Sequence, residues 1–391
     1  MSGHPPPEDH PRTPPLATPM PRERGNTRHG AIGRGEGNAS ADGSGVASTA
    51  LVRAGSVTTQ VVVEEASQVS QARREALALA RRASLDGATA DRLALVVTEA
   101  ATNLVKHAKA GRMLLAPLAF GAASGVEVIT LDRGPGMQSI VASMRDGHST
   151  TGSPGLGLGS MSRLTSNLDI YSQPGLGTVL RFEVWNAGAL PAPAPIAFGA
   201  VCVAKPGEEV PGDGWLVESA SGRHLAVVVD GLGHGIQAAT AAGAALRVAR
   251  EHGNAEPAAL LASMHGALRS TRGAAASVAT FRPHASSGVF AGIGNVRALV
   301  RTAETTRNLV SHNGTLGHQV RKFQPFDFAF PPQALVVLHS DGVATHWSLD
   351  TYPGLDRHHP GVIAATLYRD YARLRDDATI VVVRNDARAL T

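Results

Sequence analysis

The chain has 391 residues, of which 43% are hydrophobic and only 4% aromatic, and its formal net charge is +4. This length accommodates two domains whose cores depend largely on Ala, Gly and Val. The small charge, without a basic stripe interleaved with aromatic residues, argues against nucleic-acid binding. The single cysteine, Cys202, excludes an internal disulfide and a thiolate zinc site, and its apolar surroundings favour a buried strand residue over a nucleophile.

The N-terminal segment 1–50 is rich in Pro, Gly, Ser and Arg. It offers almost nothing apolar to bury, which predicts a disordered tail. The apolar run 113–126 is too short to span a bilayer, and no signal-peptide pattern stands at the N-terminus. We therefore expect a cytoplasmic protein without a membrane anchor.

The segment 56–185 alternates strand and helix patterns and predicts an α/β domain. Strands are expected at 56–65, 125–131, 168–173 and 177–185, and helices at 67–85, 88–108 and 160–168.

Polar residues border the expected core of this domain. Glu99 and Asn103 lie four residues apart, on one face of the second helix. They are either a surface Glu beside a capping Asn or a functional pair. Asp132 ends an apolar strand, just before Gly134 and Gly136. It either caps the turn or accepts a hydrogen bond from a purine amino group.

A glycine-rich loop, TGSPGLGLGS at 151–160, contains Gly155, Gly157 and Gly159, and Thr178 opens the last strand. The loop has neither the dinucleotide-binding spacing nor the Lys-Ser/Thr of a P-loop, so it is a weak signal by itself. The ordered set E-x-x-x-N, D-x-G-x-G, G-x-G-x-G and G-x-G-T is specific. It resembles the GHKL ATPases, and more closely the RsbT-like anti-sigma-type serine kinases.

This resemblance implies a two-layer α/β sandwich that binds ATP and Mg²⁺. By it, Asn103 coordinates Mg²⁺, Asp132 contacts adenine with Thr178 nearby, and the glycine loop covers the phosphates. Glu99 takes the proton of a substrate Ser or Thr hydroxyl as general base. The chain has no phospho-acceptor His helix before this domain, which argues against a histidine kinase.

A Pro/Ala linker is expected at 186–198, followed by a second domain at 199–386. Its two long helix patterns and many hairpin-connected strands predict a layered β-sandwich with helices outside. The helices are expected at 235–253 and 256–271, and strands at 215–219, 224–230, 277–283, 288–294, 296–302, 306–312, 334–340 and 378–384.

Aspartates stand at the strand ends of this second domain: Asp213, Asp230, Asp341 and the pair Asp376 and Asp377. Each could cap a turn. If they cluster, however, they need cations to remain ionised together. Oxygen ligands without His or Cys indicate Mg²⁺ or Mn²⁺, and two such ions can activate a shared water toward phosphorus.

The motifs GD-x-W, DG-x-GHG, SDG and DDAT resemble the SpoIIE/RsbX-like metal-dependent protein phosphatases. The resemblance implies an α/β/β/α sandwich with two Mn²⁺ or Mg²⁺ ions. Asp230 would bridge the ions, helped by the Gly231 carbonyl, with Asp213, Asp341 and either Asp376 or Asp377 as further ligands. His234 would be structural.

Together the two resemblances imply a bifunctional regulator of a partner-switching pathway. It would combine a kinase-like domain with a phosphoserine/phosphothreonine phosphatase, both acting on a STAS-domain anti-sigma antagonist. In the alternative, the ATP-binding domain is a non-catalytic clamp on a sigma factor or other partner, and only the phosphatase is an enzyme.

Overall fold

The computed structural model describes residues 1, 51–54, 57–144, 157–188, 194–220 and 223–387. All elements below belong to the unit 48–391. Most of the segment expected to be a disordered tail, and Gly155 of the glycine loop, lie outside the described residues.

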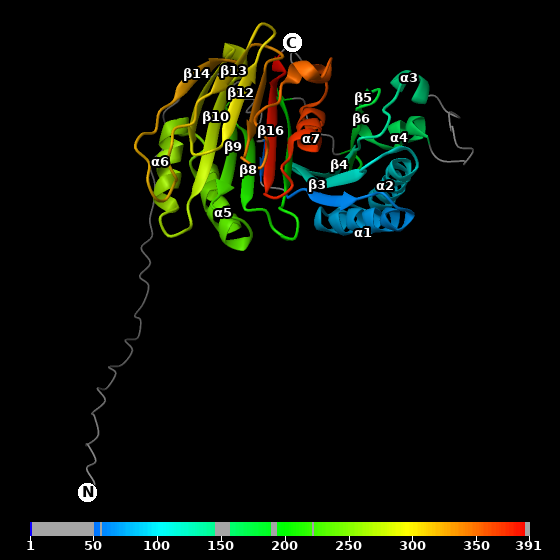
Figure 1. Ribbon diagram of the computed structural model, residues 1–391, viewed down its shortest axis with the longest axis horizontal. Helices are drawn as coiled ribbons and strands as arrows, with labels where there is room; N and C mark the ends of the chain where they lie inside the picture. Colours follow the sequence, from blue (N-terminus) through cyan, green and yellow to red (C-terminus); the bar gives the residue numbers. More distant parts are fainter. Residues whose placement is uncertain (2–50, 55–56, 145–156, 189–193, 221–222, 388–391) are drawn as a thin grey trace, which may run out of the picture. The chain divides into compact units, whose positions relative to one another are not determined.

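The first domain is an antiparallel sheet covered on one face by helices (Figure 1). The strand order is β2-β3-β4-β6-β5. In chain order its elements are β2 (Thr59–Val62), α1 (Ala66–Arg82), α2 (Gly87–His107), β3 (Arg112–Phe120), β4 (Ala123–Leu131), α3 (Ile140–Ser143), α4 (Leu158–Leu164), β5 (Ser166–Gln173) and β6 (Gly177–Trp185). The expected two-layer α/β sandwich is confirmed.

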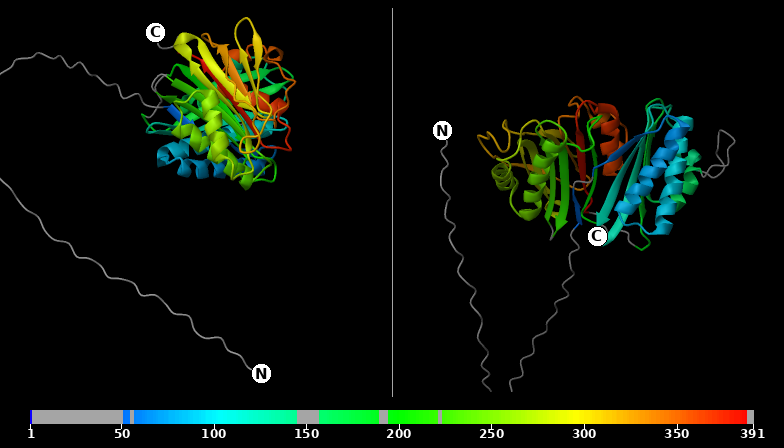
Figure 2. Two further views of the ribbon diagram at one scale, coloured as in Figure 1. Left: turned by 90° about the vertical axis from the view of Figure 1, so that its left-hand side faces the viewer. Right: turned by 90° about the horizontal axis from the view of Figure 1, so that it is seen from below.

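Helices α1 and α2 lie side by side on this sheet because each has one apolar stripe (Figure 2). Helix α2 begins where the Asp86 carboxylate accepts a hydrogen bond from the Thr89 amide at 2.8 Å. It buries Leu93, Val97 and Leu104 against the sheet, leaving the polar positions between them to face elsewhere.

Strand β3 is not among the expected strands, and it contains Pro117, which cannot donate a hydrogen bond to a neighbouring strand. The strand β2 pairs only with Arg112–Leu115 of β3. Pro117 therefore lies where β3 has become an edge strand, a position at which proline is tolerated.

The second domain contains two packed antiparallel sheets. One has the order β1-β8-β9-β10-β11-β14, and the other β13-β12-β15-β16-β7. The first sheet comprises β1 (Leu51–Ala54), β8 (Asp213–Ala220), β9 (Arg223–Gly231), β10 (Ala274–Arg282), β11 (Ser287–Ile293) and β14 (Phe326–Ala329). The second comprises β7 (Ile196–Val203), β12 (Arg297–Arg301), β13 (Thr306–Leu309), β15 (Leu335–His339) and β16 (Ala378–Asn385).

Three helices cover the outer faces of this sandwich, which confirms the expected α/β/β/α architecture. The helices α5 (Ile236–Glu251) and α6 (Pro257–Ala267) pack on the first sheet, and α7 (Pro360–Tyr371) packs on the second. Short 3₁₀ turns lie at Pro283–Ala285, Leu349–Thr351 and Leu355–Arg357. None of the described helices is both long and apolar enough to cross a membrane.

Two boundaries of the second domain differ from those expected. Strand β7 begins at Ile196, so the end of the expected linker is a strand, because Ile196 and Phe198 are buried between the two sheets. Strand β1, at 51–54, precedes the first domain in the chain but pairs with β8 of the second domain. Cys202 is buried in β7, as expected.

Helix α7, also not expected, is buried on two sides. It contacts β7 and β16 of its own domain and β4, β5 and β6 of the first domain. Leu114, Ile129 and Val179 of the first domain join Ile363 and Leu367 of α7 in one apolar cluster.

Polar contacts add to this shared core. The Asp169 carboxylate accepts hydrogen bonds from the His359 amide and from Nδ1 of His358, both at 2.7 Å. The Tyr368 hydroxyl donates to Oε1 of Gln60 at 2.7 Å. The two domains therefore pack as one body with a common core.

Candidate active sites

Helix α2 presents Glu99 and Asn103 on one half-buried face. The amide nitrogen Nδ2 of Asn103 lies 4.0 Å from Sδ of Met161, which is on α4. Among the described residues the Glu99 carboxylate forms no hydrogen bond or ion pair. That carboxylate is only half-buried, and Asn103 lies inside α2 and not at its cap positions, which are Asp86 and Ala108.

Asp132 lies directly after β4 and is 9% exposed. Its Oδ1 accepts a hydrogen bond from the Gly134 amide at 2.6 Å, so the residue does cap the turn. Burial raises the pKa of this carboxyl, and the backbone amides of Gly134 and Thr178 oppose that rise. The capping hydrogen bond uses Oδ1 of Asp132, so the other carboxylate oxygen, Oδ2, is left for the expected contact with adenine.

The Asp132 turn lies against the β5–β6 hairpin, and two glycines make this approach geometrically feasible. Gly136 has a φ of +68°, and a Cβ there would lie 2.1 Å from the Gln173 carbonyl oxygen. Gly177 has a φ of +87°, and its Cβ would lie 2.1 Å from the Asp132 carbonyl oxygen. Both positions exclude a side chain on conformational and steric grounds.

Thr178 lies at the start of β6, and its hydroxyl is 2.8 Å from the Ser172 hydroxyl. Ser172 in turn accepts a hydrogen bond from the Met137 amide at 2.8 Å. Sequence reasoning missed Ser172, since nothing in its local pattern distinguishes it from an ordinary strand residue. Gly157 caps α4 and Gly159 is buried in it, whereas the rest of the glycine loop lies outside the described residues.

In the second domain, two of the aspartates occupy directly paired positions, Asp213 on β8 and Asp230 on β9. Each has one carboxylate oxygen, Oδ2, that is buried and has no hydrogen-bond partner among the described residues. Leaving buried carboxylate oxygens unpaired is costly, so these two atoms are suited to bind a cation or a proton.

The electrostatics of the site extend to the other aspartates. Burial, together with the charges of Asp213, Asp341 and Asp376, raises the pKa of Asp230 to about 9. Burial also raises the pKa of Asp213 to about 7, against the effect of the Ser340 hydroxyl. Four carboxylates thus repel one another at one edge of the sandwich. Within the described ranges, no three His, Cys, Asp or Glu side chains converge tightly enough to form a metal-binding group by geometry alone.

The adjacent residues Asp376 and Asp377 have different surroundings. Asp377 is 2% exposed, and its two oxygens accept hydrogen bonds from the amides of Lys205 and Gly212, each at 2.8 Å. Asp376 is exposed and, among the described residues, accepts a hydrogen bond only from the Asp377 amide, at 3.0 Å. Asp377 therefore stabilises the loop segments at Lys205 and Gly212 through hydrogen bonds, whereas one carboxylate oxygen of Asp376 has no such bond among the described residues.

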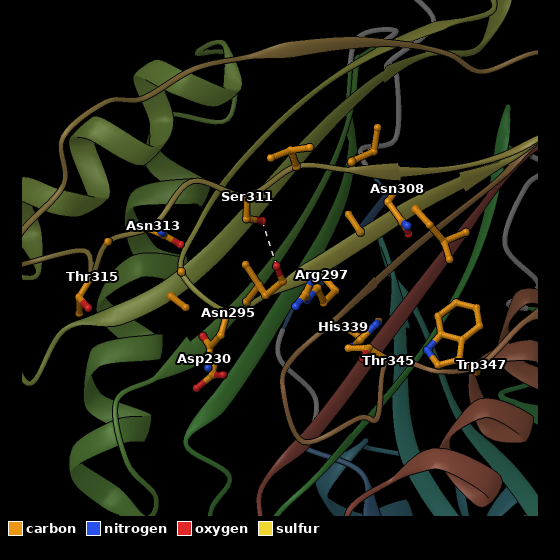
Figure 3. A pocket seen from close by; sticks show the side chains of 18 of the residues that line it. Asp230, Asn295, Arg297, Asn308, Ser311, Asn313, Thr315, His339, Thr345 and Trp347 are labelled. Atoms are coloured by element: carbon orange, nitrogen blue, oxygen red, sulfur yellow. Dashed lines mark hydrogen bonds between the residues drawn. The ribbon is translucent and has the colours of Figure 1, made fainter.

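A cleft of about 910 Å³ leads away from Asp230 (Figure 3). Asn295 lies in its wall and donates a short hydrogen bond from Nδ2 to Oδ2 of Asp341. Asn295 was missed by sequence reasoning, because only the fold brings it beside the SDG motif. His234 is exposed, and its Nδ1 lies 2.6 Å from Oε1 of Glu208.

Comparison with known families agrees with this division of the chain. Residues 62–184 match the model of the histidine kinase-like ATPase domain, and residues 220–386 match that of stage II sporulation protein E (SpoIIE). The serine/threonine-protein kinase RsbT of Bacillus subtilis is 32% identical over 94 residues, which are 24% of this chain and 71% of RsbT.

Solved structures with similarity to about half of the chain include a component of the bacterial stressosome, a modular system adapted to control secondary messenger signalling. It is 25% identical, and the match covers 49% of this chain and all of that one, with a TM-score of 0.47. RsbX in complex with magnesium is 18% identical over 49% of this chain and 96% of its own, with a TM-score of 0.43. The chain belongs to the family of histidine kinase-like ATPases that includes RsbT, and it carries a SpoIIE domain in the same polypeptide.

Proposed function

We propose that this chain regulates a partner-switching pathway by both adding and removing phosphate on a protein partner. The SpoIIE domain hydrolyses phosphoserine or phosphothreonine on a STAS-domain antagonist, and the ATPase domain transfers the γ-phosphate of ATP to the same class of protein. The observation that supports the proposal is that both domain models match within one chain, together with buried Oδ2 atoms of Asp213 and Asp230 that have no hydrogen-bond partner among the described residues.

In the phosphatase site, Asp213, Asp230, Asp341 and Asp376 would hold two Mg²⁺ or Mn²⁺ ions, with the Gly231 carbonyl as a further donor. The donor set fits hard cations, since it consists of oxygens only. When bound, such ions supply the activation of water and the positive charge that phosphate hydrolysis requires. Asn295 fixes the orientation of Asp341 by donating to its Oδ2.

In the ATPase site, Asp132 would accept a hydrogen bond from the adenine amino group, and Asn103 would contact Mg²⁺ at the phosphates. Glu99, one helical turn before Asn103, would accept the proton of the attacking serine or threonine hydroxyl. Its half-buried position, without an ion-pair partner in the part of the chain that the structure describes, is compatible with this role.

The phosphatase assignment is tested by phosphate release from a phosphorylated STAS protein in the presence of Mn²⁺. We expect Asp230→Asn to abolish release and Asp327→Asn, a matched change on the exposed side of β14, to leave it unchanged. An Asp230→Asn protein that retains the parent rate contradicts the assignment.

The kinase assignment is tested by transfer of labelled phosphate from ATP to the unphosphorylated STAS protein. We expect Glu99→Gln to lose transfer, with Asp91→Asn on the exposed face of the same helix as the control. If the parent protein binds ATP and a sigma factor or other partner but transfers nothing, the domain is the non-catalytic clamp.

A further inference from the structure

We propose that the cleft beside Asp230 receives an extended phosphorylated segment of the partner, and that Arg297 binds its phosphoryl oxygens. This inference rests on the proposed phosphatase function. It assigns the residue that recognises the phosphoryl group, which the motifs of the domain leave undefined.

The position of Arg297 follows from the strand order. It is the first residue of β12, two positions after Asn295, whose amide holds Asp341. Both residues and Asp230 line the same cleft of about 910 Å³ (Figure 3). Arg297 and Asp230 therefore open onto one cleft, and a phosphorylated segment that occupies it can contact both residues.

Charge distinguishes Arg297 from the rest of the cleft. The lining contains no other Arg or Lys, and its one histidine, His339, is 4% exposed and bonded through Nδ1 to the Ser340 carbonyl. The guanidinium of Arg297 is exposed and has no carboxylate partner among the described residues. Arg301, on the same strand, is instead paired with Asp350 at 2.7 Å.

The remaining side chains of the wall suit an extended peptide. Beside apolar residues they include neutral hydrogen-bonding groups, namely Thr306, Asn308, Ser311, Asn313, Thr315, Thr345 and Ser348. Amide and hydroxyl groups of this kind satisfy backbone donors and acceptors without a charge preference. Specificity for phosphate then falls to Arg297, whose planar fork can form two parallel hydrogen bonds with phosphoryl oxygens.

The test uses the full chain with Mg²⁺ and three probes: a phosphoserine peptide, p-nitrophenyl phosphate and inorganic phosphate. For Arg297→Gln we expect about a 10–100-fold loss of kcat/KM on both substrates, and a matching rise in the calorimetric Kd of inorganic phosphate. Arg297→Lys should recover part of the loss, since it restores charge without the fork. Arg301→Gln is the control and should behave as the parent.

The outcomes separate this inference from the proposed function. Unchanged Kd for inorganic phosphate in Arg297→Gln overturns the role of Arg297, whatever the catalytic rate of the parent. A loss confined to the peptide also overturns it, because Arg297 would then contact the peptide away from its phosphoryl group. A parent that binds phosphate through Arg297 but releases none from either substrate would contradict the phosphatase function alone.

Discussion

Replacing Ile363 in the middle of α7 by alanine should destabilise both domains together. Ile363 is completely buried in the apolar cluster that joins the first domain to the second. Removing its outer carbons leaves a cavity that solvent cannot fill, and such truncations typically cost about 2–5 kcal/mol. That is a large share of the roughly 5–15 kcal/mol by which domains are usually stable.

The assay is equilibrium unfolding in urea, followed by far-UV circular dichroism and by tryptophan fluorescence. Trp185 lies in the first domain and Trp215 in the second, so the fluorescence reports on both. We expect one coincident transition, displaced to lower urea in Ile363→Ala. Ile236→Ala is the matched control, because Ile236 is 76% exposed, and it should change stability by no more than about 0.5 kcal/mol.

Two results would refute this reasoning. A loss smaller than about 1 kcal/mol would mean that α7 is not packed as tightly as its burial indicates. Two separated transitions in the parent protein would mean that the domains unfold independently despite their common cluster.

Asp376→Ala should abolish phosphate release while leaving the melting temperature in metal-free buffer unchanged. Asp377→Ala should lower the free energy of unfolding by about 1–3 kcal/mol, because two backbone amides lose their hydrogen bonds to its carboxylate. The opposite pattern would exchange the roles of the two residues. Asp132→Asn should weaken binding of a fluorescent ATP analogue at least about tenfold if the carboxylate contacts adenine, and equal affinity would remove that contact. Burial lowers the pKa of His224 to about 4 and that of His359 well below its usual range. Below about pH 6.5 these histidines bind protons in the unfolded chain but not in the folded chain. The free energy of unfolding should therefore fall as the pH drops from about 6.5 toward 4, by up to about 1.4 kcal/mol per pH unit for each histidine. Urea unfolding at several pH values checks this, and His224→Gln should reduce the slope.

The first domain could be predicted well from the sequence where its elements follow a single period. The expected range 56–185 ends at the last residue of β6, and α1 and α2 lie where their apolar spacing placed them. The exception is β3, which contains a proline, a residue that usually interrupts a strand. The proline is tolerated because β2 is short and does not pair with that part of β3.

Helix α7 shows why the rest could not be predicted. Every residue from 360 to 369 is buried, so the segment has no polar stripe to give a helical period. A helix covered on both sides has no amphipathic signal, and the surface that covers α7 belongs to residues far away in the sequence.

The site residues were likewise predictable only where local sequence, and not contacts with distant residues, determines their position. The aspartates could be proposed because they stand at strand ends, but the choice between Asp376 and Asp377 depended on which carboxylate the loops at Lys205 and Gly212 use. Asn295 could not be found, since it is 46 residues from the Asp341 that it holds.

Strand β1 determines how the two domains are connected along the chain. The polypeptide contributes β1 to the edge of the SpoIIE-type sheet, continues through the whole ATPase domain, and only then supplies the remaining strands of that sheet. In topological terms the ATPase domain is an insertion within the phosphatase domain, not a module joined to its end. Cutting the chain between β6 and β7 would leave β8 as an unprotected edge, open to pairing with other chains.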